Sequence, residues 1–223
     1  MNRSYQTLPN SQQHLNALRL KTAIHEAGHA AAIYLGNRQK QLPPIFFNIV
    51  IGGFSGYSTQ SFAKNCFAKV QGGRLIENLP DTVENAVSEL SDKQKQAYLQ
   101  AFEADMVNFL IGPLAEANYL AMMDDEIINP HLLNLSALHN YGGTADLQEV
   151  QAYLACFSND VLEQQRKITG LFMEAFAFIN DRHNWRAIIR LANTILASQK
   201  EEISCGDIIA VLDNHSAINK KSA

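Results

Sequence analysis

Apolar residues recur every three or four positions along much of the chain, which is the spacing of amphipathic helices. The first such run covers residues 11–35; Ser11 is a good N-cap residue and Gly36-Asn37 is a typical stop signal. Residues 124–143 are predicted to form a loop. Further helices are predicted over residues 81–90, 92–123 with an interruption at Pro113, 145–157, 160–181, 185–199 and 208–212.

One segment has the character of a strand. Residues 45–51 are rich in β-branched and aromatic side chains, and three glycines, Gly52, Gly53 and Gly56, come directly after them. We therefore predict one or two short strands after the first helix and none elsewhere. The predicted fold class is mainly α, with a single domain over residues 11–213 and polar tails at 1–10 and 214–223.

Composition narrows the functional class. The 223 residues are 47% hydrophobic and 18% charged, with a formal net charge of −4 and no basic block, which disfavours nucleic-acid binding. The most apolar stretch, residues 45–54, is half the ~20 residues that a membrane helix needs, and the polar N-terminus lacks a signal-peptide core. Three separated cysteines indicate neither a disulfide framework nor a cysteine-based zinc site. We expect a cytoplasmic protein that binds neither nucleic acid nor membranes.

The residues His25-Glu26-Ala27-Gly28-His29 form an H-E-x-x-H motif inside the first predicted helix. Positions i and i+4 share a helix face, so both imidazoles can point at one metal ion and supply half of a tetrahedral zinc site. Glu26 would lie beside the metal, where it can take a proton from a zinc-bound water whose pKa is lowered toward ~7. The motif predicts one zinc ion per chain and hydrolysis of peptide bonds.

Two further observations bear on this motif. A chain of this composition would contain H-E-x-x-H by chance only about 0.01 times, although a buried histidine pair without catalysis is an alternative. Gly28 costs the helix about 1 kcal/mol relative to alanine, which indicates that something packs close to that turn.

A catalytic zinc needs a third protein ligand and one open position. Leu35 stands where the metzincin pattern has its third histidine, which excludes that pattern. Asp146 opens a predicted helix after Gly142-Gly143, although an acid there is also stabilised by the helix dipole alone. Glu116 lies on an otherwise apolar helix face and would need the metal or a ligand histidine as its partner. Spacing alone leaves both carboxylates open.

Four segments, in the right order, resemble the protease domain of the FtsH family of ATP-dependent zinc metalloproteases. The resemblance implies that His25, His29 and Asp146 bind zinc, that Glu26 is the general base, and that Glu116 supports a ligand from behind or packs near it. The four segments are Thr22 to Ala30 (T-A-I-H-E-A-G-H-A), Gly53 to Ser58 (G-F-S-G-Y-S), Gly112 to Glu116 (G-P-L-A-E) and Tyr141 to Leu147 (Y-G-G-T-A-D-L).

The chain also departs from that family. Pro113 replaces its arginine, Tyr141, Gly143 and Ala145 replace its usual threonine, alanine and asparagine, and residues 63–95 match nothing in it. No G-x-x-x-x-G-K-[ST] phosphate loop occurs in the sequence, and neither an ATPase module nor a membrane anchor is recognised. We therefore expect this chain to bind no nucleotide.

The leading hypothesis is a zinc metallopeptidase that cleaves unfolded or flexible polypeptides without an ATPase of its own. The substrate would add as a strand beside residues 49–57, with Gly53, Gly56 and Tyr57 as candidate contacts. A catalytically silent scaffold or regulator that retains the zinc site is the second hypothesis. The third is an unrelated H-E-x-x-H hydrolase in which Glu116 completes the site. A homo-oligomer or a separate partner protein is compatible with all three.

Overall fold

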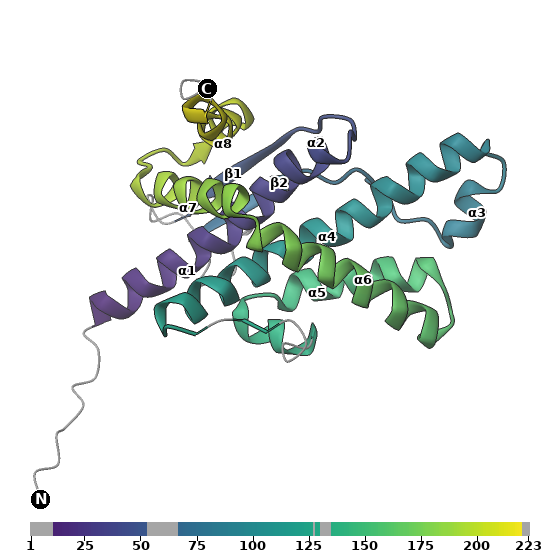
Figure 1. The fold of residues 1–223 in the computed structure, drawn as a ribbon, viewed down its shortest axis with the longest axis horizontal. Coiled ribbons are helices and arrows are strands. Elements are labelled where there is room, and N and C mark those ends of the chain that lie inside the picture. The colour runs from purple at the N-terminus through teal and green to yellow at the C-terminus, as the bar shows by residue number, and fades with distance from the viewer. Residues whose placement is uncertain (1–10, 53–66, 127, 130–134, 220–223) are drawn as a thin grey trace, which may run out of the picture.

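Helices dominate the part of the chain that the structure, a computed structural model, describes: residues 11–52, 67–126, 128–129 and 135–219 (Figure 1). This agrees with the predicted mainly α class. The helices are α1 (Ser11–Ala31), α2 (Asn37–Gln39), α3 (Val83–Val87), α4 (Asp92–Met123), α5 (Thr144–Phe157), α6 (Val161–Asn180), α7 (Arg182–Ala197) and α8 (Cys205–Asn219), with a π-helical turn at Ala32–Gly36 and a 3₁₀ helix at Leu135–Tyr141.

The long helix α4 forms the centre of the fold, and α1, α5 and α6 all pack against it. Its crossing with α1 is tight because small residues meet there. A Cβ added at Gly28 would lie 2.9 Å from the Cβ of Ala115 and 3.1 Å from the Ile111 carbonyl oxygen. The expectation that something packs close to Gly28 is therefore confirmed, and that neighbour is α4.

Several predicted helix ends agree with the structure. Ser91 precedes α4, and the Gln94 side chain accepts a hydrogen bond from its backbone N–H as in a capping box. Asp160 caps α6 through its side chain, as the predicted start of that helix requires. Asp181 caps α7, which begins at Arg182, three residues before its predicted start. The last helix is longer than predicted, because α8 continues to Asn219 through part of the predicted polar tail.

Two predicted interruptions are wrong. Gly36-Asn37 does not stop the first helix: both residues are helical, and the chain leaves the helix only at Gln41, whose φ is +57°. Gly36 packs beside the ring of Phe178, where an added Cβ would make an ordinary contact of 3.6 Å. Pro113 lies inside α4, where packing against neighbouring helices offsets the roughly 3 kcal/mol that an interior proline costs.

Within the described residues, the sheet has three antiparallel strands in the order β2-β1-β3. Strand β1 (Phe47–Ile51) lies in the predicted segment, but β2 (Ala68–Gly72) and β3 (Glu202–Ile203) lie outside it, so the prediction of no other strand is wrong. The sequence of β2 is Ala-Lys-Val-Gln-Gly with only Ala68 buried, and β3 has two residues. Ala68 and Val70 do alternate with Lys69 and Gln71, but this run is short and mostly exposed, and two residues of β3 are too few to show a pattern.

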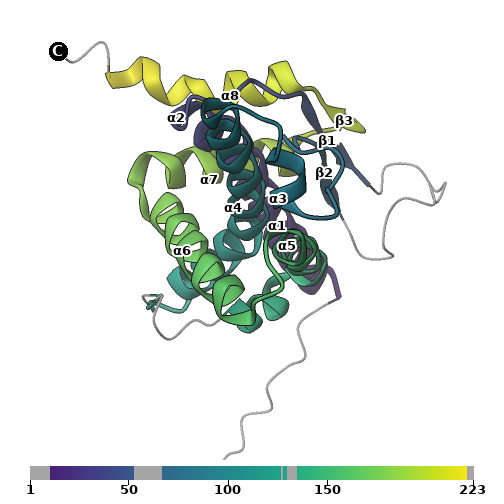
Figure 2. The same cartoon turned by 90° about the vertical axis from the view of Figure 1, so that its right-hand side faces the viewer.

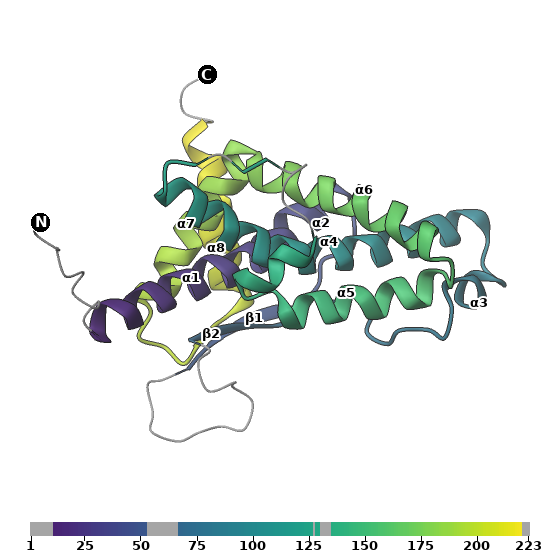
Figure 3. The same ribbon diagram turned by 90° about the horizontal axis from the view of Figure 1, so that it is seen from below.

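The sheet lies on one side of the helices, next to α1 (Figures 2 and 3). Strand β1 pairs along one edge with β2 and along the other, at Ile49 and Val50, with β3. A peptide therefore cannot add beside the described start of the 49–57 segment as predicted. The candidates Gly53, Gly56 and Tyr57 lie outside the described residues.

Among the described helices, none combines the length and the apolar character that crossing a membrane requires.

Candidate metal centre

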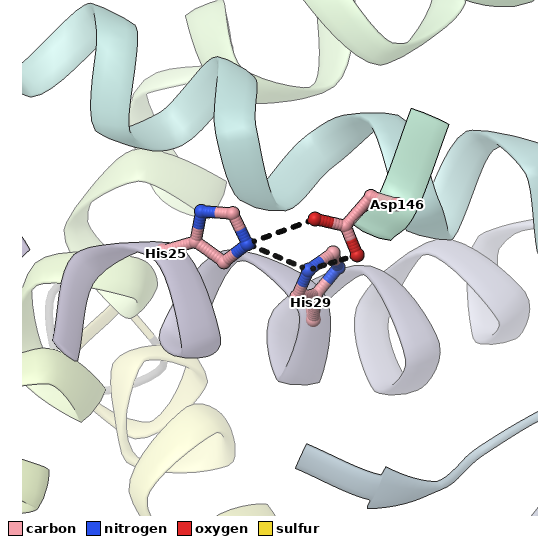
Figure 4. Close-up of side chains that lie close together, drawn as sticks. All are labelled: His25, His29 and Asp146. Atoms are coloured by element: carbon pink, nitrogen blue, oxygen red, sulfur yellow. Dashed lines mark hydrogen bonds and ion pairs between the residues drawn. The ribbon is translucent and has the colours of Figure 1, made fainter. Parts of the chain in front are cut away.

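Three side chains from two helices converge on one point (Figure 4). His25 and His29 project from one face of α1, and Asp146 projects from the first turn of α5. The two Nε2 atoms are 3.1 Å apart, and the Asp146 carboxylate oxygens lie 3.1 Å from His25 Nε2 and 3.2 Å from His29 Nε2. A tetrahedral zinc ion with bonds of 2.0–2.1 Å separates neighbouring ligand atoms by about 3.3–3.4 Å. The two Asp146 contacts are made by different oxygens of its carboxylate, and one ligand atom from each of the three residues lies within 4.8 Å of the other two, so this ligand triangle could hold one such ion.

A sharp turn brings Asp146 to the histidines. Gly142 has a φ of +72°, a conformation that favours glycine, and the N–H of Gly143 donates to the Leu138 carbonyl at 3.2 Å. A Cβ at Gly143 would lie 2.8 Å from both that carbonyl oxygen and the Cβ of Pro113. The two glycines thus let the start of α5 approach α4 and direct Asp146 inward.

The ring of His29 is fixed by α4. Its Nδ1 lies 2.8 Å from the backbone carbonyl oxygen of Asn108, and since a carbonyl only accepts, Nδ1 carries the proton and Nε2 keeps its lone pair for a metal. Gly112 faces the same ring: an added Cβ would lie only 2.2 Å from Nε2. The position of His29 therefore requires a glycine at 112.

Glu116 lies behind His25, on the opposite side of the ring from Asp146. Its Oε2 is 3.5 Å from His25 Nδ1, whereas His25 Nε2 faces Asp146. The group of converging ligand atoms contains Asp146 and not Glu116. A carboxylate in this place orients the imidazole and increases its basicity as a ligand.

Glu26 lies next to the ligands and is not one of the converging atoms. Its side chain is buried, and its Oε2 accepts a hydrogen bond of 2.7 Å from the backbone N–H of Val70 in β2. Burial raises the pKa of Glu26 above its usual 4.5, although the nearby imidazoles of His25 and His29 act against this. A carboxylate with a raised pKa is a stronger base than an exposed one.

The charges of the three converging groups are strongly coupled. Burial lowers the pKa of His25, but the carboxylates of Asp146, 3.1 Å from its Nε2, and of Glu116, 3.5 Å from its Nδ1, outweigh burial and raise that pKa from 6.5 to about 10. Although burial acts against it, the charges of the two histidines hold the pKa of Asp146 well below its usual range. Without a metal, the cluster thus attracts a proton to the place where a cation would bind, which is the behaviour of a cation site.

The cluster opens into a cleft of about 610 Å³. Helix α1 contributes one wall, α5 another, and the outer edge of β2 a third. Two hydrogen bonds flank the β1–β2 pair: the N–H of Gly52 donates to the Phe67 carbonyl, and the N–H of Gly73 donates to the Phe46 carbonyl. Because hydrogen-bonded and non-bonded residues alternate along an antiparallel pair, these two bonds show which residues of β2 turn their backbone groups toward β1. The backbone N–H and C=O of Val70 and of Gly72 therefore point away from β1, on the side where both residues line the cleft.

The chain matches no protein-family model, no curated protein and no solved structure. The resemblance to the FtsH protease domain stays a prediction from the residues that carry it.

Sequence reasoning missed four residues that shape the centre. Asn108 acts through its backbone carbonyl and Val70 through its backbone N–H, so their side chains gave no signal. Gly112 lies in the G-P-L-A-E segment, yet nothing in its spacing indicated that the His29 ring leaves no space for a side chain there. Asp105, a buried acid on α4, also lines the cleft; its one sequence signal is an acid between the apolar residues Ala104 and Met106.

Proposed function

We propose that this protein is a zinc metallopeptidase, similar to the FtsH protease domain, which hydrolyses peptide bonds in flexible polypeptides. One observation carries the proposal: one ligand atom from each of His25, His29 and Asp146 lies within 4.8 Å of the other two, with the carboxylate of Glu26 beside them, on the wall of an open cleft. A structural zinc site is closed and has no use for a base, whereas a catalytic site has three protein ligands and an open position.

Each residue has a separate role in the proposed reaction. His25, His29 and Asp146 hold the zinc, which supplies a Lewis acid and a water of lowered pKa when it is bound. Glu26 accepts the proton of that water and passes it to the leaving amine. Asn108 keeps His29 in the tautomer that binds metal, and Glu116 orients His25.

The proposed substrate is an extended segment that adds to the outer edge of β2. That edge lines the cleft, whereas β1 is paired on both sides. The backbone of Gly72 faces outward and can pair with a peptide. A folded domain rarely offers such a segment, so unfolded or flexible chains are the expected substrates. We expect cleavage in the cytoplasm, without nucleotide bound to this chain.

The ligand assignment is tested by measuring zinc in purified variants. The wild type is expected to hold about one zinc per chain. His25→Ala, His29→Ala and Asp146→Asn should each lose it, because each removes one corner of the triangle. Unchanged zinc content in the histidine variants would refute the site. An Asp146→Asn protein that keeps its zinc while Glu116→Gln loses it would transfer the third ligand to Glu116.

A further inference from the structure

Asp105 on α4 is a buried carboxylate of the cleft that the proposed reaction does not use. It is 2% exposed. Its Oδ1 accepts a hydrogen bond of 2.9 Å from the backbone N–H of Leu75. Its Oδ2 accepts from the N–H of Ile76 at 2.8 Å and from the hydroxyl of Tyr153 at 2.9 Å. Burying a carboxylate is costly, and this one is compensated by three donors, two of which are successive backbone groups.

These backbone groups belong to the segment that leaves β2. Strand β2 ends at Gly72, and the next residues carry the two N–H groups that Asp105 holds. Within the strand itself, the outward N–H of Val70 donates to Glu26. Two carboxylates thus hold this part of the chain: Glu26 of α1 holds β2 at Val70, and Asp105 of α4 holds the segment that follows the strand.

The same two helices carry the metal centre. Glu26 follows the ligand His25 directly, and Asp105 lies about one turn before Asn108, whose carbonyl oxygen holds His29. An apolar residue at 105 would bury at lower cost but could not accept two backbone N–H groups. The carboxylate therefore ties the edge strand to the helix that orients a ligand.

We propose that Asp105 is a positioning residue, which holds the edge of β2 at the distance from His25, His29 and Asp146 that a bound peptide requires. This inference rests on the proposed peptidase function. A peptide paired with β2 reaches the metal ligands only while that edge keeps its place, so a loosened edge weakens binding of the substrate and raises KM.

Two matched variants separate positioning from stability. Asp105→Asn has one oxygen in place of two and turns an N–H₂ group toward a backbone donor, which releases part of the segment after β2. Tyr153→Phe removes the third donor, together with its longer contact of 3.4 Å to the Ile76 carbonyl oxygen, and leaves both backbone N–H bonds to Asp105 intact. Each loses about one hydrogen bond, so both should lower the Tm.

The readout is steady-state cleavage of a flexible peptide by the zinc-loaded proteins, together with their zinc content and amide exchange. Asp105→Asn should raise KM about tenfold, with kcat within about twofold and zinc content unchanged. The amides of Leu75 and Ile76 should exchange faster in this variant only. Tyr153→Phe should leave KM at the wild-type value.

The other outcomes are equally decisive. An unchanged KM in Asp105→Asn, or an equal rise in both variants, would overturn the positioning role while wild-type cleavage still supported the peptidase. No cleavage by the wild type would remove the proposed function and this inference with it. If Asp105→Asn does not fold, Asp105→Glu keeps the charge and displaces the segment by one methylene; a wild-type KM in that variant would also overturn the role.

Discussion

The cleft has a helical wall, formed by α1, α4 and α5, and a strand wall, formed by β2 and the segment after it. The two walls hold their residues in different ways. The helical wall fixes side chains: His29 lies against Gly112 with no room for a Cβ, and α1 crosses α4 at Gly28 with equally little room. The strand wall fixes backbone: Val70 donates to Glu26, and the segment after β2 donates to Asp105. Metal ligation needs atoms placed by rigid packing, whereas strand addition needs a fixed edge with an outward-facing backbone, here that of Gly72, and one cleft combines the two.

The largest expected effect is on the helical wall, from Gly112→Ala. The added methyl would lie 2.2 Å from His29 Nε2, so the imidazole must leave its place in the triangle. We expect loss of zinc binding together with a destabilisation of about 1–3 kcal/mol. Metal analysis and thermal unfolding measure the two effects separately.

Gly170→Ala is the matched control. Gly170 lies within α6 with nothing inside 4 Å of an added Cβ. The same substitution there should leave zinc content unchanged and stabilise the protein by about 0.5–1 kcal/mol, through helix propensity. Equal zinc content in the two alanine variants would contradict the account of the helical wall.

The next effect concerns pH. In the metal-free protein the pKa of His25 is raised from 6.5 to about 10, so its stabilising proton is fully present below pH 6.5 and is lost as the pH rises toward 10. Zinc must displace that proton. Apparent zinc affinity should therefore increase by up to about tenfold per pH unit across this range.

Calorimetric titration in buffers of different ionisation enthalpy measures the protons released. We expect the Tm difference between zinc-loaded and metal-free protein to widen between pH 6.5 and 9, since the metal-free form alone loses stability. A zinc affinity that is independent of pH in this range would mean that His25 carries no proton before the metal binds.

A smaller effect is expected for Glu116→Gln. Glu116 faces His25 Nδ1 at 3.5 Å and supports the ligand from behind, so its loss should weaken zinc affinity by about 10–100-fold without emptying the site at saturating metal. Glu149→Gln, on α5 three residues after Asp146, removes a half-exposed ion pair with Arg74 and should change affinity little. Competition with a chelator of known affinity distinguishes the two; equal affinities would remove the supporting role.

More residues of the helical wall than of the strand wall could be predicted from the sequence. The spacing of His25 and His29 follows from helix geometry, and the glycines before Asp146 indicated a sharp turn, so these residues could be named in advance. Strand β2 could not, because its side chains are mostly exposed and its position depends on pairing with β1, far away in the sequence. The helix interruptions predicted at Gly36 and Pro113 were wrong for a related reason: tertiary packing overrides local propensity in the middle of a core.

The most direct test of the central claim is cleavage of casein by the wild type and by Glu26→Gln, each with its zinc content measured in the same preparation. Glu26 lies outside the ligand triangle, so the variant should keep about one zinc per chain and lose activity by about 10²–10⁴-fold, with or without ATP. Equal rates in the two zinc-loaded proteins would contradict the catalytic assignment. Zinc in both with cleavage by neither would instead identify a silent scaffold that retains the metal site.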